Sequence, residues 1–147
     1  RFDEIGRIMN TSHNGDRVAI FDSTKGQIPY RAPSSNSYIL GLLESLESGD
    51  PEKVTNAQLQ WQPGDYHCSC PEIDKMVDIV IRIEGVEGAQ LAGAGLGGCM
   101  MVFLKKEATQ SLIDNLQRDY YTPAKKTSSI LFCKPVAGSG VLLKDPS

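Results

Sequence analysis

Apolar residues recur at spacings of three and four along several stretches of the chain, which predicts amphipathic helices. The first stretch begins at the N-terminus, and its apolar face has four members: Phe2, Ile5, Ile8 and Met9. A second helix should begin at an N-cap, Asn36 or Ser37. We expect its apolar stripe to be buried: Ile39, Leu42, Leu43 and Leu46. Asp50 and Pro51 then predict an N-cap and a first-turn proline for a helix that extends to about Gln60.

Two more helices are predicted in the second half of the chain. The segment Ser69–Glu72 has the spacing of a capping box. It precedes a continuous apolar face that ends before Gly85: Ile73, Met76, Val77, Val80 and Ile83. The last helix should begin near Glu107 and end at Pro123, with five residues on its apolar face: Ala108, Leu112, Ile113, Leu116 and Tyr120.

Short β-prone runs lie between these helices. Six runs are predicted to be extended: Val18–Phe21, Gln27–Arg31, Ala89–Ala92, Met100–Leu104, Ile130–Cys133 and Val136–Leu142. The first two predict a hairpin, in which Pro29 confines the second run to a sheet edge or to coil. The third and fourth flank a glycine-rich turn and predict another hairpin. The order of elements predicts an α+β domain, with helices covering one face of an antiparallel sheet.

Composition narrows the classes of function. A chain of 147 residues fits one domain, and its formal net charge of −3 provides no basic surplus for neutralising nucleic-acid phosphates. We therefore expect no nucleic-acid partner. No apolar run approaches the roughly 20 residues of a membrane helix, so no membrane partner is expected either. The four cysteines follow no secreted framework, which favours free thiols and a cytoplasmic location.

The candidate chemistry is concentrated in the turn Gly93-Ala94-Gly95-Leu96-Gly97-Gly98. Its glycines allow positive φ angles, so successive backbone amides can point at one anion. A dinucleotide-binding fingerprint is excluded, because that motif requires a helix directly after the turn and the run that follows here is strand-like. A Walker A motif is excluded because no Gly-Lys-Ser/Thr follows. The alternative is a tight hairpin that binds no ligand.

Four segments also carry a family resemblance. Gly88–Cys99 resembles the third signature motif of the GHMP kinase superfamily, in particular that of its galactokinase branch. Three other segments resemble further parts of that branch, in the same order along the chain: Gly6–His13, Asp65–Asp74 and Pro135–Val141. Together the four segments cover both ends and the middle of the chain.

The resemblance implies a ferredoxin-like C-terminal domain, formed by residues 1–147 of a longer chain. In this superfamily ATP and substrate bind between that domain and an N-terminal domain, which supplies the main phosphate loop and the catalytic groups. The resemblance thus implies a cytoplasmic enzyme that uses ATP and Mg²⁺ to phosphorylate a sugar, at its anomeric hydroxyl. It also implies that this chain contains no catalytic residue and is inactive without its N-terminal domain.

The resemblance further assigns residues to the cleft between the two domains. Six residues are expected beside the phosphates: Gly93, Ala94, Gly95, Leu96, Gly97 and Gly98. Ser12 and His13 are the expected polar residues on the cleft side, and the alternative for His13 is a hydrogen bond to local backbone. No metal ligand is expected.

The sequence departs from the family pattern in three places. Gln90 replaces a basic residue and Leu96 replaces an aromatic one. His13 and Tyr66 are separated by 52 residues, which predicts an insertion at about residues 14–64. These departures leave the sugar open, and the insertion could serve as a lid or an assembly surface.

Two other functions remain open at this stage. A non-catalytic sensor on the same scaffold would bind sugar and ATP without turnover. An isomerase or decarboxylase of the superfamily is the third alternative.

Other chemistry-bearing residues have simpler interpretations. A zinc site is disfavoured for a group that lacks further ligands at suitable spacing: His67, Cys68 and Cys70. Three acidic residues are predicted to form a capping group and a solvated helix face, and not a catalytic pair: Glu72, Asp74 and Asp78. Trp61 and Tyr66 could stack on a sugar, but packing is the favoured interpretation.

Overall fold

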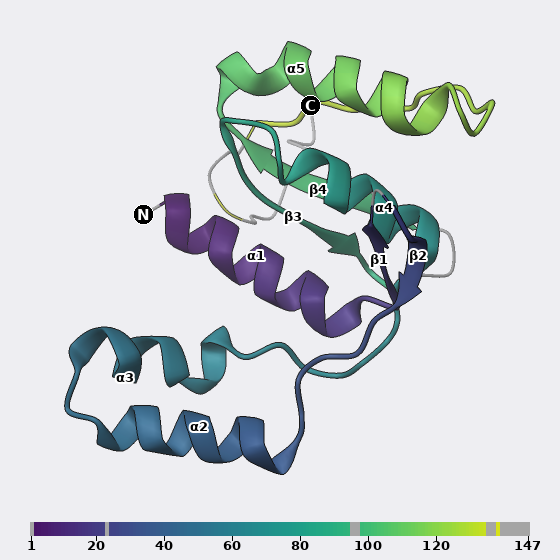
Figure 1. Ribbon diagram of the computed structural model, residues 1–147. Coiled ribbons are helices and arrows are strands. Elements are labelled where there is room, and N and C mark those ends of the chain that lie inside the picture. Colours follow the sequence, from purple (N-terminus) through teal and green to yellow (C-terminus); the bar gives the residue numbers. More distant parts are fainter. Residues whose placement is uncertain (1, 23, 95–97, 135–137, 139–147) are drawn as a thin grey trace, which may run out of the picture.

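The computed structural model describes residues 2–22, 24–94, 98–134 and 138. Its elements, shown in Figure 1, follow in this order: α1 (Phe2–Asp16), β1 (Ala19–Asp22), β2 (Gly26–Pro29), α2 (Asn36–Glu47), α3 (Pro51–Ala57), the 3₁₀ turn η1 (Leu59–Trp61), α4 (Pro71–Val80), β3 (Val86–Ala92), β4 (Cys99–Leu104), the 3₁₀ turn η2 (Lys106–Ala108), α5 (Thr109–Leu116) and the π-helical turn η3 (Gln117–Tyr121). The predicted α+β class is confirmed. No described helix is both long and apolar enough to cross a membrane.

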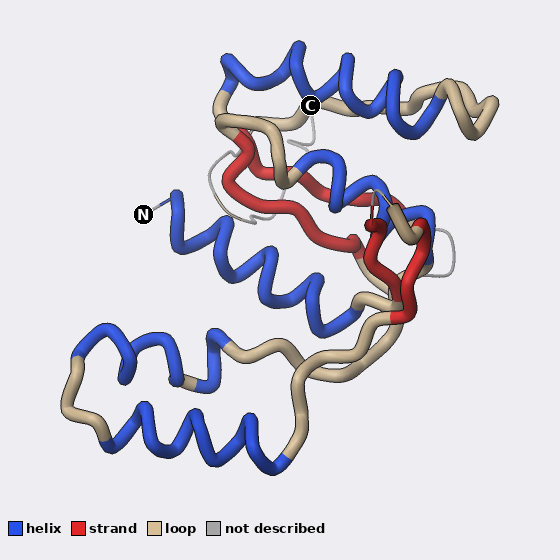
Figure 2. The backbone as a smooth tube through the Cα atoms, in the orientation of Figure 1, coloured by secondary structure: helices blue, strands red, loops and turns tan. Residues whose placement is uncertain are grey.

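The described strands form two separate antiparallel hairpins (Figure 2). In the first, β1 pairs with β2 from Ala19–Pro29 to Asp22–Gly26, as predicted. In the second, β3 pairs with β4 from Val86–Leu104 to Ala92–Cys99, also as predicted. Helix α4 packs on this second hairpin, and α5 packs on α4.

The predicted strand Ile130–Cys133 is wrong, because this segment is irregular. Leu131 is 89% exposed and Phe132 is 57% exposed, so no neighbouring strand covers these β-prone side chains. A β-prone run becomes a strand only where it finds a paired, half-buried surface. The predicted extended piece Val136–Leu142 lies, apart from Gly138, outside the described residues.

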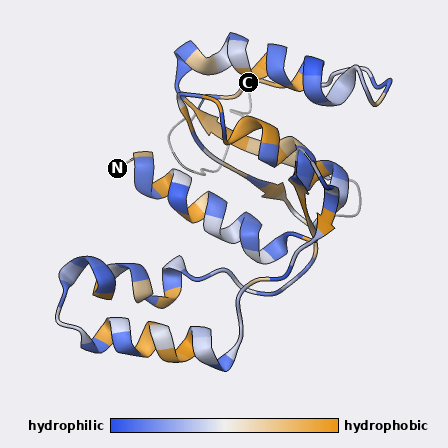
Figure 3. Cartoon of the chain, in the orientation of Figure 1, coloured by the Kyte–Doolittle hydropathy of each residue, from blue (hydrophilic) through white to orange (hydrophobic). Residues whose placement is uncertain are grey.

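The core lies between α4, α5 and the β3–β4 hairpin, whose ribbons carry hydrophobic stretches in Figure 3. Seven buried residues form it: Ile73, Val77, Val80, Ala89, Leu91, Leu112 and Leu116. Burial of each large aliphatic side chain contributes about 1.5–3 kcal/mol. The predicted apolar faces of α4 and α5 are therefore confirmed at their centres.

The predicted burial of α2 is wrong. No residue of this helix is buried, and Ile39, Leu43 and Leu46 are each more than 40% exposed. The cap also lies one residue earlier than predicted, since Ser35 accepts a hydrogen bond from the Tyr38 amide. The α2–α3 pair stands beside the rest of the domain (Figure 1), and its apolar stripe lines a groove with the end of α3 and the residues that follow it. The Asp50 cap of α3 is confirmed, with its side chain accepting from the amides of Glu52 and Lys53.

Candidate functional site

The six residues Gly93–Gly98 connect β3 to β4. Ala92 and Cys99 form the last pair of the ladder, so the turn joins two neighbouring antiparallel strands, and a strand follows it. This hairpin is the geometry predicted from the sequence. Gly93 has a φ angle of +79°, which L side chains rarely adopt. Gly93, Ala94 and Gly98 are exposed, while Gly95, Leu96 and Gly97 lie outside the described residues.

Gly98 leaves no room for a side chain. A Cβ atom at this position would lie 2.8 Å from the carbonyl oxygen of Ala92, which is a backbone atom and cannot move aside. Glycine is thus required at Gly98 by close backbone approach and favoured at Gly93 by its φ angle. The described residues of this turn, Gly93, Ala94 and Gly98, therefore lie at the surface and carry little side chain.

Helix α1 fixes the position of β3 from its outer edge. The two elements cross at Gly6 and Gly88, where a Cβ atom on Gly88 would lie 2.5 Å from the carbonyl oxygen of Gly6. The same contact decides which side of α1 is buried. Its buried residues are Gly6, His13 and Gly15, whereas Phe2, Ile5 and Ile8 are 68%, 48% and 52% exposed.

Asn10 and His13 then bind the edge of β3. The Oδ1 atom of Asn10 accepts a hydrogen bond from the Ala89 amide at 2.9 Å, and its Nδ2 atom donates to the Glu87 carbonyl at 3.5 Å. The Nδ1 atom of His13 accepts from the Leu91 amide at 3.3 Å. These side chains satisfy backbone groups that would otherwise be free on an edge strand. Gly6, Asn10 and His13 are spaced four and three residues apart, so they lie on the same face of α1. This spacing is the signal in the sequence for the contact.

His13 links the hairpin to the start of α4. Because its Nδ1 atom accepts a hydrogen bond, the proton of the neutral ring lies on Nε2, which is 3.3 Å from Asp74 Oδ1. His13 is 1% exposed and Asp74 is 0% exposed. The histidine was expected to bond local backbone or to face the cleft. It instead bonds a strand 78 residues away and is enclosed by α1, β3 and α4.

Asp74 accepts three hydrogen bonds in addition to its 3.3 Å contact with His13 Nε2. Its Oδ2 atom accepts from the amides of Val18 and Ala19 at 2.9 and 2.8 Å, and its Oδ1 atom accepts from the Ser69 hydroxyl at 2.7 Å. Burial would raise the pKa of Asp74, but the contact with His13 and the hydrogen bonds from Ser69 and the two amides outweigh it, so the pKa lies below its ordinary value. The predicted capping box is wrong, because Ser69 bonds Asp74 and the N-cap residue is Cys70, whose side chain caps nothing.

Asp78 lies one helical turn further along and holds β1 in the same way. It accepts from the Phe21 amide at 3.0 Å and from Arg17 Nη1 at 2.7 Å. Arg17 is 3% exposed and also donates to the Ala19 carbonyl. The predicted solvated face is therefore wrong for Asp74 and Asp78, and only Glu72 is exposed. A pair of acids four residues apart beside a buried face was the signal in the sequence.

These contacts bring the end of β3 close to the start of α4. His13 contacts Leu91 near the end of β3 and Asp74 near the start of α4. Cys70, Leu91 and Met100 also belong to one packed cluster. Figure 1 accordingly shows the start of α4 beside the end of β3 and the start of β4. The end of β3 and the start of β4 thus lie near the N-terminus of α4, whose partial positive charge favours anions.

A recess of about 260 Å³ lies between α1 and the segment Leu59–Tyr66, which begins with η1. Helix α1 contributes Ile8, Thr11, Ser12 and Asp16, and the other side is lined by Leu59, Gln60, Gln62, Gly64 and Tyr66. Ser12 is exposed and faces this recess, whereas its neighbour His13 is buried. Tyr66 is 78% exposed, so the predicted packing role is wrong for this ring. The Arg7 guanidinium stacks on the Trp61 ring, with its central carbon 4.0 Å from the ring centre.

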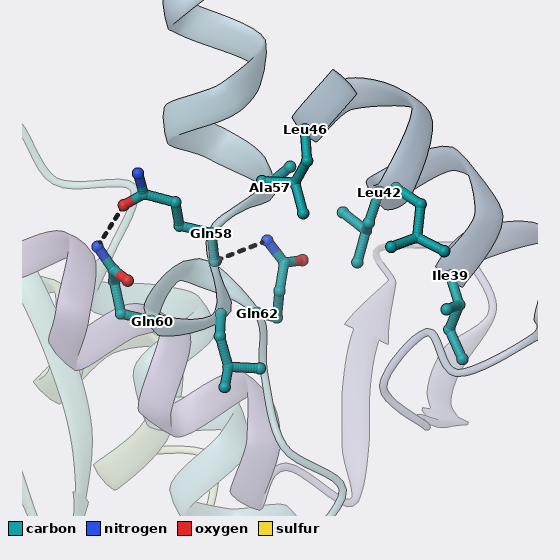
Figure 4. Close-up of a pocket in the computed structure, with 9 residues that line it drawn as sticks. Ile39, Leu42, Leu46, Ala57, Gln58, Gln60 and Gln62 are labelled. Atoms are coloured by element: carbon teal, nitrogen blue, oxygen red, sulfur yellow. Dashed lines mark hydrogen bonds between the residues drawn. The ribbon is translucent and has the colours of Figure 1, made fainter. Parts of the chain in front are cut away.

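A second, apolar groove of about 440 Å³ lies between α2 and the residues after α3. Figure 4 shows Leu46 beside Ala57, Leu42 across from Gln62, and Ile39 further along α2. This groove holds the stripe that the sequence predicted to be buried.

The histidine and cysteine cluster near Tyr66 has structural partners. His67 contacts Asp65, and the Cys68 thiol donates to Asp16 at 3.0 Å. That hydrogen bond, together with burial, raises the pKa of Cys68. Across residues 2–22, 24–94, 98–134 and 138, no group of three or more His, Cys, Asp or Glu side chains could hold a metal ion.

Comparisons with known proteins agree with this architecture. Residues 42–122, more than half of the chain, match the family described as GHMP kinases C terminal. The chain is 31% identical to the galactokinase of Streptococcus mutans over 141 residues. The aligned region covers 94% of this chain and 36% of that protein. It is 30% identical to the galactokinase of Pyrococcus furiosus over 109 residues, and this aligned region covers 72% of the chain and 31% of that protein. The bovine galactokinase is 35% identical over 60 residues, or 41% of the chain and 15% of that protein.

The chain spans about a third or less of the length of these relatives. Within that span the glycine hairpin, the α1 edge contact and the α4 acids form one connected unit. The chain belongs to the GHMP kinase family, as a C-terminal domain of the galactokinase type.

Proposed function

We propose that this chain is the C-terminal domain of a sugar kinase that transfers the γ-phosphate of ATP to a sugar, at its anomeric hydroxyl. Gly93–Gly98 is the part of the chain that faces the phosphates, and Ser12 lies on the sugar side of the same cleft. The observation that carries the proposal is the glycine-rich connection between the paired strands β3 and β4, whose described residues Gly93, Ala94 and Gly98 are exposed. The galactokinase relatives support the choice of reaction.

The chemistry of the turn suits this role. Phosphoryl transfer depends on positioning and on stabilising charge, and backbone amides provide both without a mobile side chain. At the two ends of the turn, the close backbone approach at Gly98 and the positive φ at Gly93 both favour glycine over residues with a side chain. The rigid contacts of β3 with Asn10 and His13 hold its base in place.

His13 contributes to the proposed site by positioning and not by contact with substrate. Both of its ring nitrogens face protein groups, Leu91 and Asp74. Asp74 and Asp78 are likewise engaged by β1, so neither is free to act as a base. We therefore assign no catalytic residue to this chain and propose that it is inactive alone.

ATP would be used as its Mg²⁺ complex, and the catalytic groups would come from a further domain outside these 147 residues. No step of the proposal is assigned to a metal ligand in the described part of the chain. We also propose that residues 14–64 are an insertion relative to galactokinases, and support comes from α2, which buries none of its residues. The full-length enzyme would act in the cytoplasm.

A panel of sugars with ATP, tested on the full-length protein, examines this proposal. We expect turnover with at least one sugar, a sharp loss of activity in Gly98→Val, and no loss in Gly41→Ala, whose Cβ would meet nothing within 4 Å. The 147-residue chain alone should show no turnover. ATP and sugar binding without turnover by the full-length protein would indicate a sensor and would contradict the kinase.

A further inference from the structure

We propose that the recess between α1 and the Leu59–Tyr66 segment is a binding site for one neutral sugar ring. This inference rests on the proposed function for its choice of ligand class and for the placement of Ser12 on the sugar side. The geometry stands apart from the glycine turn, because the recess is formed by α1 and by the end of the proposed insertion.

The recess presents hydrogen-bonding groups that the protein does not use. Within the described part of the chain, no protein group bonds to the side-chain hydroxyls of Thr11, Ser12 and Tyr66. Asp16 binds the Cys68 thiol through Oδ1, which leaves Oδ2 available as an acceptor. A ligand with several hydroxyl groups would satisfy these donors and acceptors together.

The apolar parts of the lining fit the same ligand. Ile8 and Leu59 are 52% and 86% exposed, and the Tyr66 ring is 78% exposed. A sugar ring combines apolar C–H faces with hydroxyl edges, so it can pack on such a ring while its edges bond to the polar groups. The volume of about 260 Å³ suits one ring and not an extended chain.

The charge of the recess excludes an anion. Asp16 is the only ionisable acid or base of its lining apart from the Tyr66 phenol, and no Lys, Arg or His contributes to it. A carboxylate repels phosphate but accepts hydrogen bonds from neutral hydroxyls. We therefore assign the recess to an unphosphorylated sugar.

Backbone contacts fix the two walls relative to each other. The Tyr66 amide donates to the Gly15 carbonyl at 2.8 Å, and a Cβ atom on Gly15 would lie 2.8 Å from the Gly64 nitrogen. The recess is thus formed before any ligand arrives, which lowers the entropic cost of binding.

The test is a titration of the 147-residue chain with D-galactose, followed by amide NMR shifts. Expected shifts are confined to the lining, at Thr11, Ser12, Gly64 and Tyr66. Tyr66→Ala and Ser12→Ala should each weaken binding by about tenfold. Phe132→Ala, an aromatic residue that is 57% exposed but outside the recess, is the matched control and should bind unchanged.

Several outcomes would overturn this assignment. They are shifts elsewhere in the chain, unchanged binding in both variants, or equal shifts with inorganic phosphate. D-glucose and D-mannose, titrated in parallel, measure selectivity, and the absence of shifts with all three sugars would also reject the site. ATP titrations that monitor Gly93 and Gly98 report separately on the proposed kinase function, so failure of either proposal can be recognised.

Discussion

Gly6 of α1 and Gly88 of β3 lie in direct backbone contact. A Cβ atom on Gly6 would be 2.1 Å from the Glu87 carbonyl oxygen, and one on Gly88 would be 2.5 Å from the Gly6 carbonyl oxygen. This close approach allows Asn10 and His13 to reach the edge of β3. The helix thereby acts as the neighbour that the outer edge of β3 would otherwise lack.

Gly88→Ala should destabilise the domain, because the added methyl group meets backbone on the opposite element and forces α1 away from β3. We expect a loss of about 1–3 kcal/mol in the free energy of unfolding. Urea denaturation measures it, with Gly41→Ala as the control, since a Cβ there meets nothing within 4 Å. Equal stability of the two variants would show that the helix and strand are not in contact.

Asn10→Ala should leave the Ala89 amide without its partner. The expected loss is about 1–3 kcal/mol, together with faster hydrogen exchange at Ala89. Asn115→Ala is the control, because Asn115 bonds only to neighbours on its own exposed helical surface. Unchanged exchange at Ala89 would contradict the edge contact.

Asp74 should make stability dependent on pH in the acid range. Its pKa is lower in the folded protein than in the unfolded chain, so its contribution is present above the unfolded value, about 4, and is lost as the pH falls through the folded value. Asp74→Asn should cost roughly 1.5–3 kcal/mol near neutral pH and should flatten the fall in stability below about pH 4. The exposed Asp3, replaced by Asn, should leave the curve unchanged. Urea midpoints between about pH 7 and pH 3 provide the measurement, and identical curves for wild type and Asp74→Asn would refute the prediction.

Cys68 should alkylate slowly in spite of its partial exposure. Its thiol donates to Asp16, and this bond raises the pKa of Cys68, so less of the reactive thiolate is present. Asp16→Asn should therefore speed the reaction of Cys68 with iodoacetamide several-fold at mildly alkaline pH. Mass spectrometry of the labelled peptide reads the rate, with the exposed Cys99 in the same sample as an internal reference. An alkylation rate at Cys68 that is the same in wild type and Asp16→Asn would contradict this prediction.

Leucines in α2 and α5 should differ in their contribution to stability. Leu112 is 3% exposed and belongs to the core, so Leu112→Ala should cost about 2–5 kcal/mol. Leu43 is 49% exposed, so Leu43→Ala should cost less than about 1 kcal/mol. Thermal unfolding of the two variants compares them directly. A similar cost at both sites would mean that the groove beside α2 is covered.

Local patterns in the sequence correctly predicted most of the helices and both hairpins. The period of Ile73, Val77 and Val80 specified α4 and its buried face, because a hydrophobic stripe at helical spacing has few other ways to leave water. The glycines of the 93–98 turn and the β-prone runs beside it specified the second hairpin. Each of these predictions depends on neighbours along the chain.

The candidate site was only partly predictable. The sequence indicated Gly93–Gly98, Ser12 and His13, but it did not indicate that His13 would be buried beside Asp74. It also gave Asp74 and Asp78 a solvated role, since charged residues are seldom buried without partners. Their partners are the backbone amides of β1, more than 50 residues earlier in the chain.

The sequence by itself determined where the helices, the turns and the central core residues lie, because these follow from local spacing and from backbone preferences. Only the tertiary structure decided which faces are covered. The apolar stripes of α1 and α2 remain exposed, while Gly6, His13 and Asp74 are enclosed. The physical reason is that a face is buried only when a distant segment packs against it, and close approach and hydrogen bonding can select a small or polar face over an apolar one.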